Sequence, residues 1–115
     1  MSTSRIDPGT FAELQANAGA DFVCELVDTF AEEAPQIVAE MRSALAAGAA
    51  ERFRRAAHSL KSNSATFGAR APEALARGLE LAGLAADPAR DQAAIDALQA
   101  ALDRAAAALK ELARG

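Results

Sequence analysis

Apolar residues recur three and four positions apart along most of this 115-residue chain. Such spacing puts them on one face of an α-helix, whereas a half-buried strand would show strict alternation. Alanine, the strongest helix former, supplies much of the 51% hydrophobic content, and tryptophan and tyrosine are absent. The last segment shows the pattern best, with Ile95, Leu98, Leu102, Ala105, Leu109 and Leu112 inward and Asp96, Arg104, Lys110, Glu111 and Arg114 outward. We therefore predict an all-α protein.

Start and stop signals divide the chain into helices. Asp7-Pro8 and Asp87-Pro88 each join a capping carboxylate to a proline suited to the first helical position. Glycines that follow the last apolar position of a segment end helices. The expected elements are a short helix of about ten residues that ends at Gly19, a long helix from Asp21 to Gly48, a helix over 50–67 that ends at Gly68, a helix with Pro72 in its first turn that ends near Ala86, and a final helix from Pro88.

The expected inward residues follow from the helical phase. They are Phe22, Val23, Leu26, Val27, Phe30, Ile37, Val38, Met41 and Leu45 in the second helix and Phe53, Ala57, Leu60, Ser64 and Phe67 in the third. The first helix carries the apolar residues Phe11 and Leu14, and the fourth carries Leu75, Leu79, Leu81 and Leu84. Because the phase continues across Pro35, we predict one helix kinked near residues 31–35, with two shorter helices as the alternative. The single cysteine, Cys24, lies among apolar residues and should be buried as a small hydrophobe.

Four substantial helices with short connections favour an antiparallel up-down four-helix bundle, here with a short additional N-terminal helix. The length suits one domain over residues 1–115 with its core at about 6–112. The net charge of −4 argues against a nucleic-acid partner. No apolar run is long enough to cross a bilayer, and residues 1–5 lack the apolar core of a signal peptide, so we expect a cytoplasmic protein without a membrane partner. The charged outer face favours a monomer.

The only histidine, His58, lies in the helix over 50–67. At about 100° per residue it projects about 140° from the apolar stripe, beside Arg54, Lys61, Ser62 and Ala65. A buried His58 would draw the neighbouring cations toward the core with it. The imidazole is therefore expected at the surface, either idle or functional.

The residue inventory excludes several kinds of chemistry. One histidine and one cysteine on different helices cannot make a catalytic zinc site, and the sequence has no glycine-rich nucleotide loop and no paired inward carboxylates. Ser59 and Ser62 lie near His58, but no acid is positioned to complete a serine triad. An exposed neutral imidazole can still accept a phosphoryl group, with its second nitrogen protonated and oriented by a neighbour or water. Lys61 and Arg54 would offset the incoming charge, within a local excess of cations that includes Arg52 and Arg55.

The run from His58 to Ala69 resembles the signature of histidine-containing phosphotransfer (HPt) domains, His-x-Leu-Lys-Gly-x-Ser-x-x-x-Gly-Ala. Ala56-Ala57 and Leu79-Glu80 are also similar to that family, and the helix order fits from about residue 6 to 112. In one departure, Ser62 stands where the family usually has glycine. A serine side chain on the docking face would tighten or hinder the approach of a partner, or donate a hydrogen bond of its own, so the resemblance leaves partner choice and transfer rate open.

The resemblance implies that His58 is the phosphoacceptor of a bacterial two-component phosphorelay. It exchanges a phosphoryl group with aspartates of response-regulator receiver domains, which supply Mg²⁺; a hybrid histidine kinase is a further possible partner. Such a chain is a phosphoryl carrier rather than a true enzyme and has no cofactor of its own. Lys61 would stabilise the phosphoryl group, and Ser64 would support helix packing. Arg54, Arg55, Ser62, Ala65 and Gly68 would form the docking and phosphate environment, with Gly68 also at the helix end. The alternatives are an HPt-like docking module that carries no phosphate and a plain structural domain.

Overall fold

The structure is a computed structural model of the chain, and it describes residues 6–84 and 87–114. Over these residues the chain forms five α-helices and no strand: α1 (Pro8–Ala18), α2 (Ala20–Ala47), α3 (Ala50–Phe67), α4 (Arg70–Ala82) and α5 (Pro88–Arg114). The prediction of an all-α protein is confirmed.

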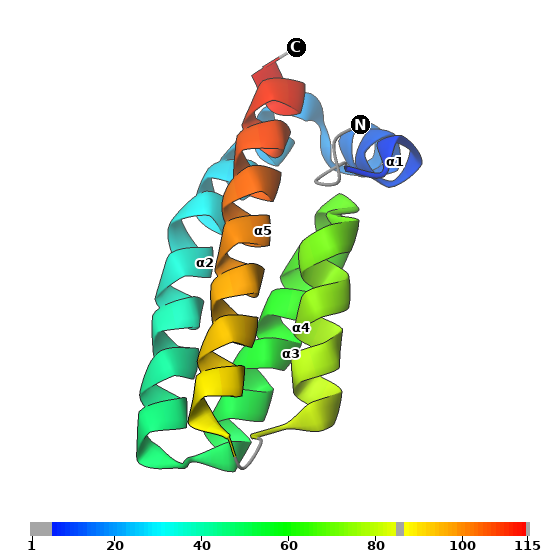
Figure 1. Cartoon of the computed structure of the whole chain (residues 1–115). Coiled ribbons are helices and arrows are strands. Elements are labelled where there is room, and N and C mark those ends of the chain that lie inside the picture. The colour runs from blue at the N-terminus through cyan, green and yellow to red at the C-terminus, as the bar shows by residue number, and fades with distance from the viewer. Residues whose placement is uncertain (1–5, 85–86, 115) are drawn as a thin grey trace.

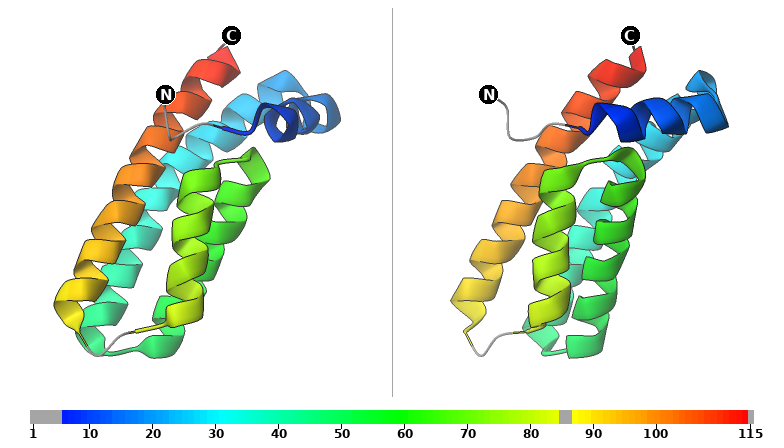
Figure 2. Two further views of the ribbon diagram at one scale, coloured as in Figure 1. Left: turned by 45° about the vertical axis from the view of Figure 1, so that its right-hand side comes forward. Right: turned by 90° about the vertical axis from the view of Figure 1, so that its right-hand side faces the viewer.

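The two longest helices, α2 and α5, lie side by side, and the shorter pair α3 and α4 packs against them (Figure 1). In this arrangement α3 has α2 and α4 as its neighbours, and α5 also contacts both α2 and α4. The long helices extend beyond the turn that joins α3 to α4. Helix α1 crosses over the turn that joins α3 to α4 (Figure 2) and contacts α2 and α3.

Both Asp-Pro signals cap helices. The Asp7 carboxylate accepts a hydrogen bond from the Thr10 N–H at 3.3 Å, and the Asp87 carboxylate accepts one from the Ala89 N–H at 3.1 Å. The Thr10 hydroxyl also donates to Asp7. Together with the guanidinium of Arg70, it lowers the pKa of the Asp7 carboxyl below its ordinary value.

All three glycine signals agree with the observed helix ends. Gly48 and Gly68 adopt left-handed conformations with φ of 67° and 74° and follow α2 and α3 directly, and Gly19 follows α1. The end expected near Ala86 is wrong, because α4 stops at Ala82 and Gly83 turns the chain with φ of 67°. Ala86 itself lies outside the described residues.

Helix α2 is continuous through Pro35, so the alternative of two shorter helices is wrong. Pro35 is exposed, on the side of α2 where water can hydrate the carbonyl that loses its N–H partner. The helix begins at Ala20, one residue before the expected Asp21. The kink stays a prediction.

The core forms where the apolar stripes meet, and its largest fully buried side chains include Phe53, Met41, Leu60, Ile95 and Leu98. Phe22 and Leu112, expected to point inward, are exposed instead, and so are Leu75 and Leu81 of α4. Leu81 follows the buried Leu79 by two positions, about 200° around the helix, so it points outward with 81% of its surface exposed. Phe22 and Leu112 lie in the first turn of α2 and the last turn of α5, where fewer neighbours cover them.

Cys24 is half-buried rather than fully buried. Its thiol lies 3.4 Å from the carbonyl oxygen of Ala113 in the last turn of α5, to which it donates. It therefore packs at the contact of α2 with α5, and the expected burial is only partly met.

Candidate functional site

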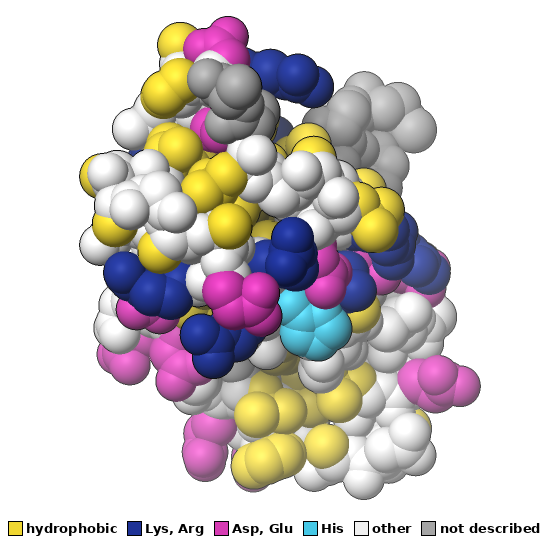
Figure 3. Space-filling view, turned by 90° about the horizontal axis from the view of Figure 1, so that it is seen from below, with side chains coloured by type: hydrophobic (Ala, Val, Ile, Leu, Met, Phe, Trp, Pro, Cys, Tyr) yellow, Lys and Arg dark blue, Asp and Glu magenta, His cyan; other side chains and the backbone are white. Residues whose placement is uncertain are grey.

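His58 lies in the middle of α3 with 57% of its side chain exposed. In Figure 3 the histidine side chain is open to solvent and is bordered by Lys, Arg, Asp and Glu side chains. Arg54, Ser62 and Ala65 are exposed as the helical phase predicts, whereas Lys61 is half-buried. The imidazole is therefore at the surface.

Glu80 of α4 joins His58 to Lys61. One carboxylate oxygen lies 2.7 Å from Nδ1 of His58, and the other lies 2.8 Å from Nζ of Lys61. These hydrogen bonds, first from Lys61 and then from His58, lower the pKa of the Glu80 carboxyl below its ordinary value of 4.5. The carboxylate therefore stays ionised at neutral pH.

The Glu80 carboxylate also fixes the tautomer of the neutral imidazole. An ionised carboxylate only accepts hydrogen bonds, so Nδ1 must carry the proton in this contact. Nε2 then keeps its lone pair, and in the described part of the chain no hydrogen bond occupies it. In this tautomer Nε2 is the unprotonated nitrogen of the ring, on the side away from the contact with Glu80.

The expectation that no acid is positioned to complete a serine triad is therefore wrong for the acid, because the Glu80 carboxylate contacts the His58 ring. A serine triad is nevertheless absent among the described residues, because neither Ser59 nor Ser62 is hydrogen-bonded to the ring. Sequence spacing carries a signal for Glu80: His58 is ten residues before Gly68, and Glu80 is eleven residues after Ala69. In a helical hairpin, residues equally far from the turn lie at the same level, and α3 and α4 form such a hairpin.

The remaining site residues occupy distinct positions. Arg54 forms an ion pair with Glu51 at 3.2 Å, one turn before it on α3. Arg55 is exposed and has no hydrogen bond or ion pair within the described ranges. Ser64 is fully buried on the core face of α3, and its hydroxyl has no hydrogen-bond partner among the described residues.

Gly68 is not brought together with His58. It lies ten residues further along the chain, about 15 Å along the helix axis. It is buried beside the first turn of α1, where its carbonyl accepts a hydrogen bond from the Asp7 N–H at 2.8 Å. The structure thus places Gly68 at a packing contact, and the docking role expected for it stays a prediction.

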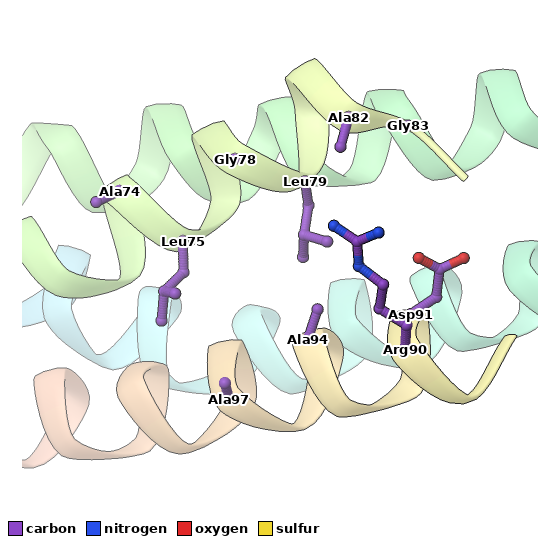
Figure 4. Close-up of a pocket in the computed structure, with 10 residues that line it drawn as sticks. All are labelled: Ala74, Leu75, Gly78, Leu79, Ala82, Gly83, Arg90, Asp91, Ala94 and Ala97. Atoms are coloured by element: carbon purple, nitrogen blue, oxygen red, sulfur yellow. The ribbon is translucent and has the colours of Figure 1, made fainter. Parts of the chain in front are cut away.

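A groove of about 390 Å³ lies on another side of the molecule, between α4 and α5. Figure 4 shows Leu75 and Leu79 of α4 and Arg90 of α5 directed into it. Within residues 6–84 and 87–114 there is no group of three metal-ligating side chains. None of the helices described is both long and apolar enough to cross a membrane.

A sequence model of the Hpt domain matches residues 25–108, which include His58, Lys61 and Glu80. The match covers most of the chain, and the chain therefore belongs to the Hpt domain family. Members of this family act in phosphotransfer in two-component phosphorelays and interact with receiver domains. Comparison with curated proteins and with solved structures found no match.

Proposed function

We propose that this chain is a histidine phosphotransfer protein that accepts and donates a phosphoryl group at Nε2 of His58. The observation that carries the proposal is the contact of Nδ1 with the Glu80 carboxylate, which leaves the outer nitrogen unprotonated in an exposed ring. The fold proposed for it is an antiparallel up-down four-helix bundle, which the short connections between α2, α3 and α4 favour.

In the transfer step the lone pair of Nε2 attacks the phosphorus of an aspartyl phosphate. The N–P bond forms, the bond from phosphorus to the aspartyl oxygen breaks, and the aspartate leaves as a carboxylate with the bonding electron pair. The ring has used its lone pair and still carries the proton on Nδ1, so it becomes cationic. A carboxylate oxygen of Glu80 lies 2.7 Å from Nδ1, which carries this proton, so Glu80 stabilises the positive charge of the ring.

Lys61 is the charged partner that we propose for the phosphoryl oxygens. It lies one turn from His58 on α3, and its ammonium group is held 2.8 Å from Glu80. With 26% of its side chain exposed, Lys61 is mostly covered by neighbouring residues but still reaches the surface. A cation at that place offsets the negative charge of the bound phosphoryl group.

The partner is a receiver domain that brings the phosphoryl donor and Mg²⁺, because this chain has no nucleotide motif of its own. Arg54, Arg55, Ser62 and Ala65 border His58 along α3 and form the surface that the receiver covers. We expect the protein to act as a cytoplasmic monomer in this exchange, with a hybrid histidine kinase as a further partner.

The test is transfer from phosphorylated receiver domains in the presence of Mg²⁺. The chain should acquire label that is labile in acid and stable in alkali, and His58→Gln should acquire none. Thermal unfolding of His58→Gln controls for folding and should match the parent, since the side chain is exposed. Equal labelling of parent and His58→Gln would refute the proposal.

The alternative is an HPt-like docking module that binds a receiver without phosphate transfer, and the exposed Ser62 at the usual glycine position is the observation that favours it. The variant Ser62→Gly distinguishes the two. A carrier hindered by the serine should transfer faster after the change. A docking module should bind the receiver with either residue, bind equally after His58→Ala, and never acquire label.

A further inference from the structure

A receiver domain that reaches His58 must also cover a face beside it. An ordinary specific interface buries about 800 Å² on each partner, far more than one imidazole. The two faces that flank α3 are those of α4 and α2. Their charged side chains differ in whether they already have partners within the chain.

On the α4 side the charges nearest the site are paired. Glu80 binds both His58 and Lys61, and further along α4 Arg77 lies 3.0 Å from Glu73. A partner that used these groups would first have to break contacts within the chain. This side of the site orients the ring and offers little free charge to a partner.

On the α2 side of the site lie four exposed charged side chains. Glu33, Glu40 and Arg55 have no hydrogen bond or ion pair within residues 6–84 and 87–114. Arg52 has only a long hydrogen bond of 3.4 Å to the hydroxyl of Ser43. These side chains can therefore pair with an incoming protein without losing contacts of comparable strength.

These charged side chains surround one depression along the seam of α2 and α3. A hollow of about 280 Å³ is lined by Ile37 and Glu40 from α2 and by Arg52, Arg55 and Ser59 from α3. A second hollow of about 300 Å³ shares Ile37 and Glu40 and extends to Glu33. Ser59 directly follows His58 in the chain, so the depression begins beside the reactive residue.

We propose that this surface, the split-charge patch of Glu33, Ile37, Glu40, Arg52, Arg55 and Ser59, selects the receiver domain by charge. The partner would present acidic side chains opposite Arg52 and Arg55 and basic side chains opposite Glu33 and Glu40, around an apolar contact with Ile37. An apolar centre with a charged rim is the usual build of a specific transient interface. Rim charges of this kind steer association and exclude partners of the wrong sign. This inference rests on the proposed phosphotransfer function.

Matched charge reversals test the patch. Arg55→Glu is compared with Arg104→Glu, and Glu40→Lys with Asp103→Lys; both control residues are exposed on α5 and have no ion pair among the residues described. Transfer from a cognate phosphorylated receiver is followed over a range of receiver concentrations, at about 0.02 M and about 0.5 M salt. The maximal rate at saturating receiver is recorded separately from the half-saturating concentration.

At low salt Arg55→Glu and Glu40→Lys should each raise the half-saturating receiver concentration about tenfold, and the controls should change it less than about twofold. High salt should bring the half-saturating concentrations of all variants together. Patch variants that match their controls at both salt concentrations would overturn the inference and leave the proposed function intact. A parent protein and controls that accept no label from any receiver would refute the proposed function, and the patch with it.

Discussion

The substitution Gly68→Ala separates the packing role of Gly68 from a role in phosphotransfer. Gly68 has φ of 74°, a conformation that costs an alanine about 1–2 kcal/mol. A Cβ there would also lie 2.9 Å from Cβ of Thr10, 3.1 Å from Cβ of Asp7 and 3.2 Å from the Asp7 carbonyl oxygen. Forcing such an atom into a packed contact costs about 1–3 kcal/mol more. The expected total is about 2–5 kcal/mol.

Gly48→Ala is the matched control, because Gly48 has φ of 67° and no atom lies within 4 Å of its added Cβ. It should lose only the backbone contribution of about 1–2 kcal/mol. At about 4 °C per kcal/mol, thermal unfolding should fall by about 4–8 °C for Gly48→Ala and about 8–20 °C for Gly68→Ala. Circular dichroism on heating measures both.

Transfer at His58 should be unaffected by Gly68→Ala at temperatures where the variant is folded, because about 15 Å of helix separates the two residues. Equal stability losses in the two glycine variants would refute the packing argument. A folded Gly68→Ala that transferred slowly would return Gly68 to the docking environment expected from the sequence.

Three further outcomes test the site and the core. Glu80→Gln should slow transfer about tenfold or more, because an amide that donates to Nδ1 keeps the proton on Nε2. Single-turnover transfer measures this rate. The control is Glu73→Gln on the same helix, which should change the rate less than about twofold. Leu60→Ala removes a fully buried side chain and should cost about 2–5 kcal/mol in urea unfolding, and a loss below about 1 kcal/mol would contradict its place in the core. The pKa values of the Glu80 and Asp7 carboxyls in the folded protein lie below their ordinary values of 4.5 and 3.8. Each carboxylate therefore stabilises the fold fully at a pH above its ordinary pKa, and this stabilisation is lost as the pH falls through the lowered pKa of the folded protein. Urea unfolding should therefore show lower stability below about pH 4, and a double variant with Glu80→Gln and Asp7→Asn should show a smaller loss.

Local signals predicted the helices well because their causes are local. The cap at Asp7 and the left-handed glycines at Gly48 and Gly68 depend on side chains and dihedral angles within a few residues. The expected end of α4 near Ala86 is too late, because that expectation counts Leu84 as part of the helix. Gly83 interrupts the helix before it, and Leu84 packs partly against the core from the connection that follows.

The site was predicted only in part, for a physical reason. The exposure of His58 follows from the phase of one helix, which the sequence contains in full. Its contact with Glu80 depends on how two helices are aligned by the turn at Gly68, a tertiary relation that no single helix encodes. Phe22 and Leu112 are exposed for a similar reason. The helical phase predicts the direction in which a side chain points, but it does not predict whether a neighbouring helix extends far enough to cover that side chain.

Residues on the two sides of α3 should affect two different kinetic quantities, the maximal transfer rate and the half-saturating receiver concentration. Glu80 contacts the reacting ring but lies among paired charges, so its substitution should lower the maximal rate and leave the half-saturating receiver concentration nearly unchanged. Arg55 and Glu40 form no hydrogen bond or ion pair with the ring or with each other among the residues described, so their substitution should mainly raise the half-saturating receiver concentration. The double variant Glu80→Gln with Arg55→Glu should therefore combine the two single effects without coupling, as expected for groups that share no partner. A coupling above about threefold would mean that the paired and the unpaired side of the helix act as one surface.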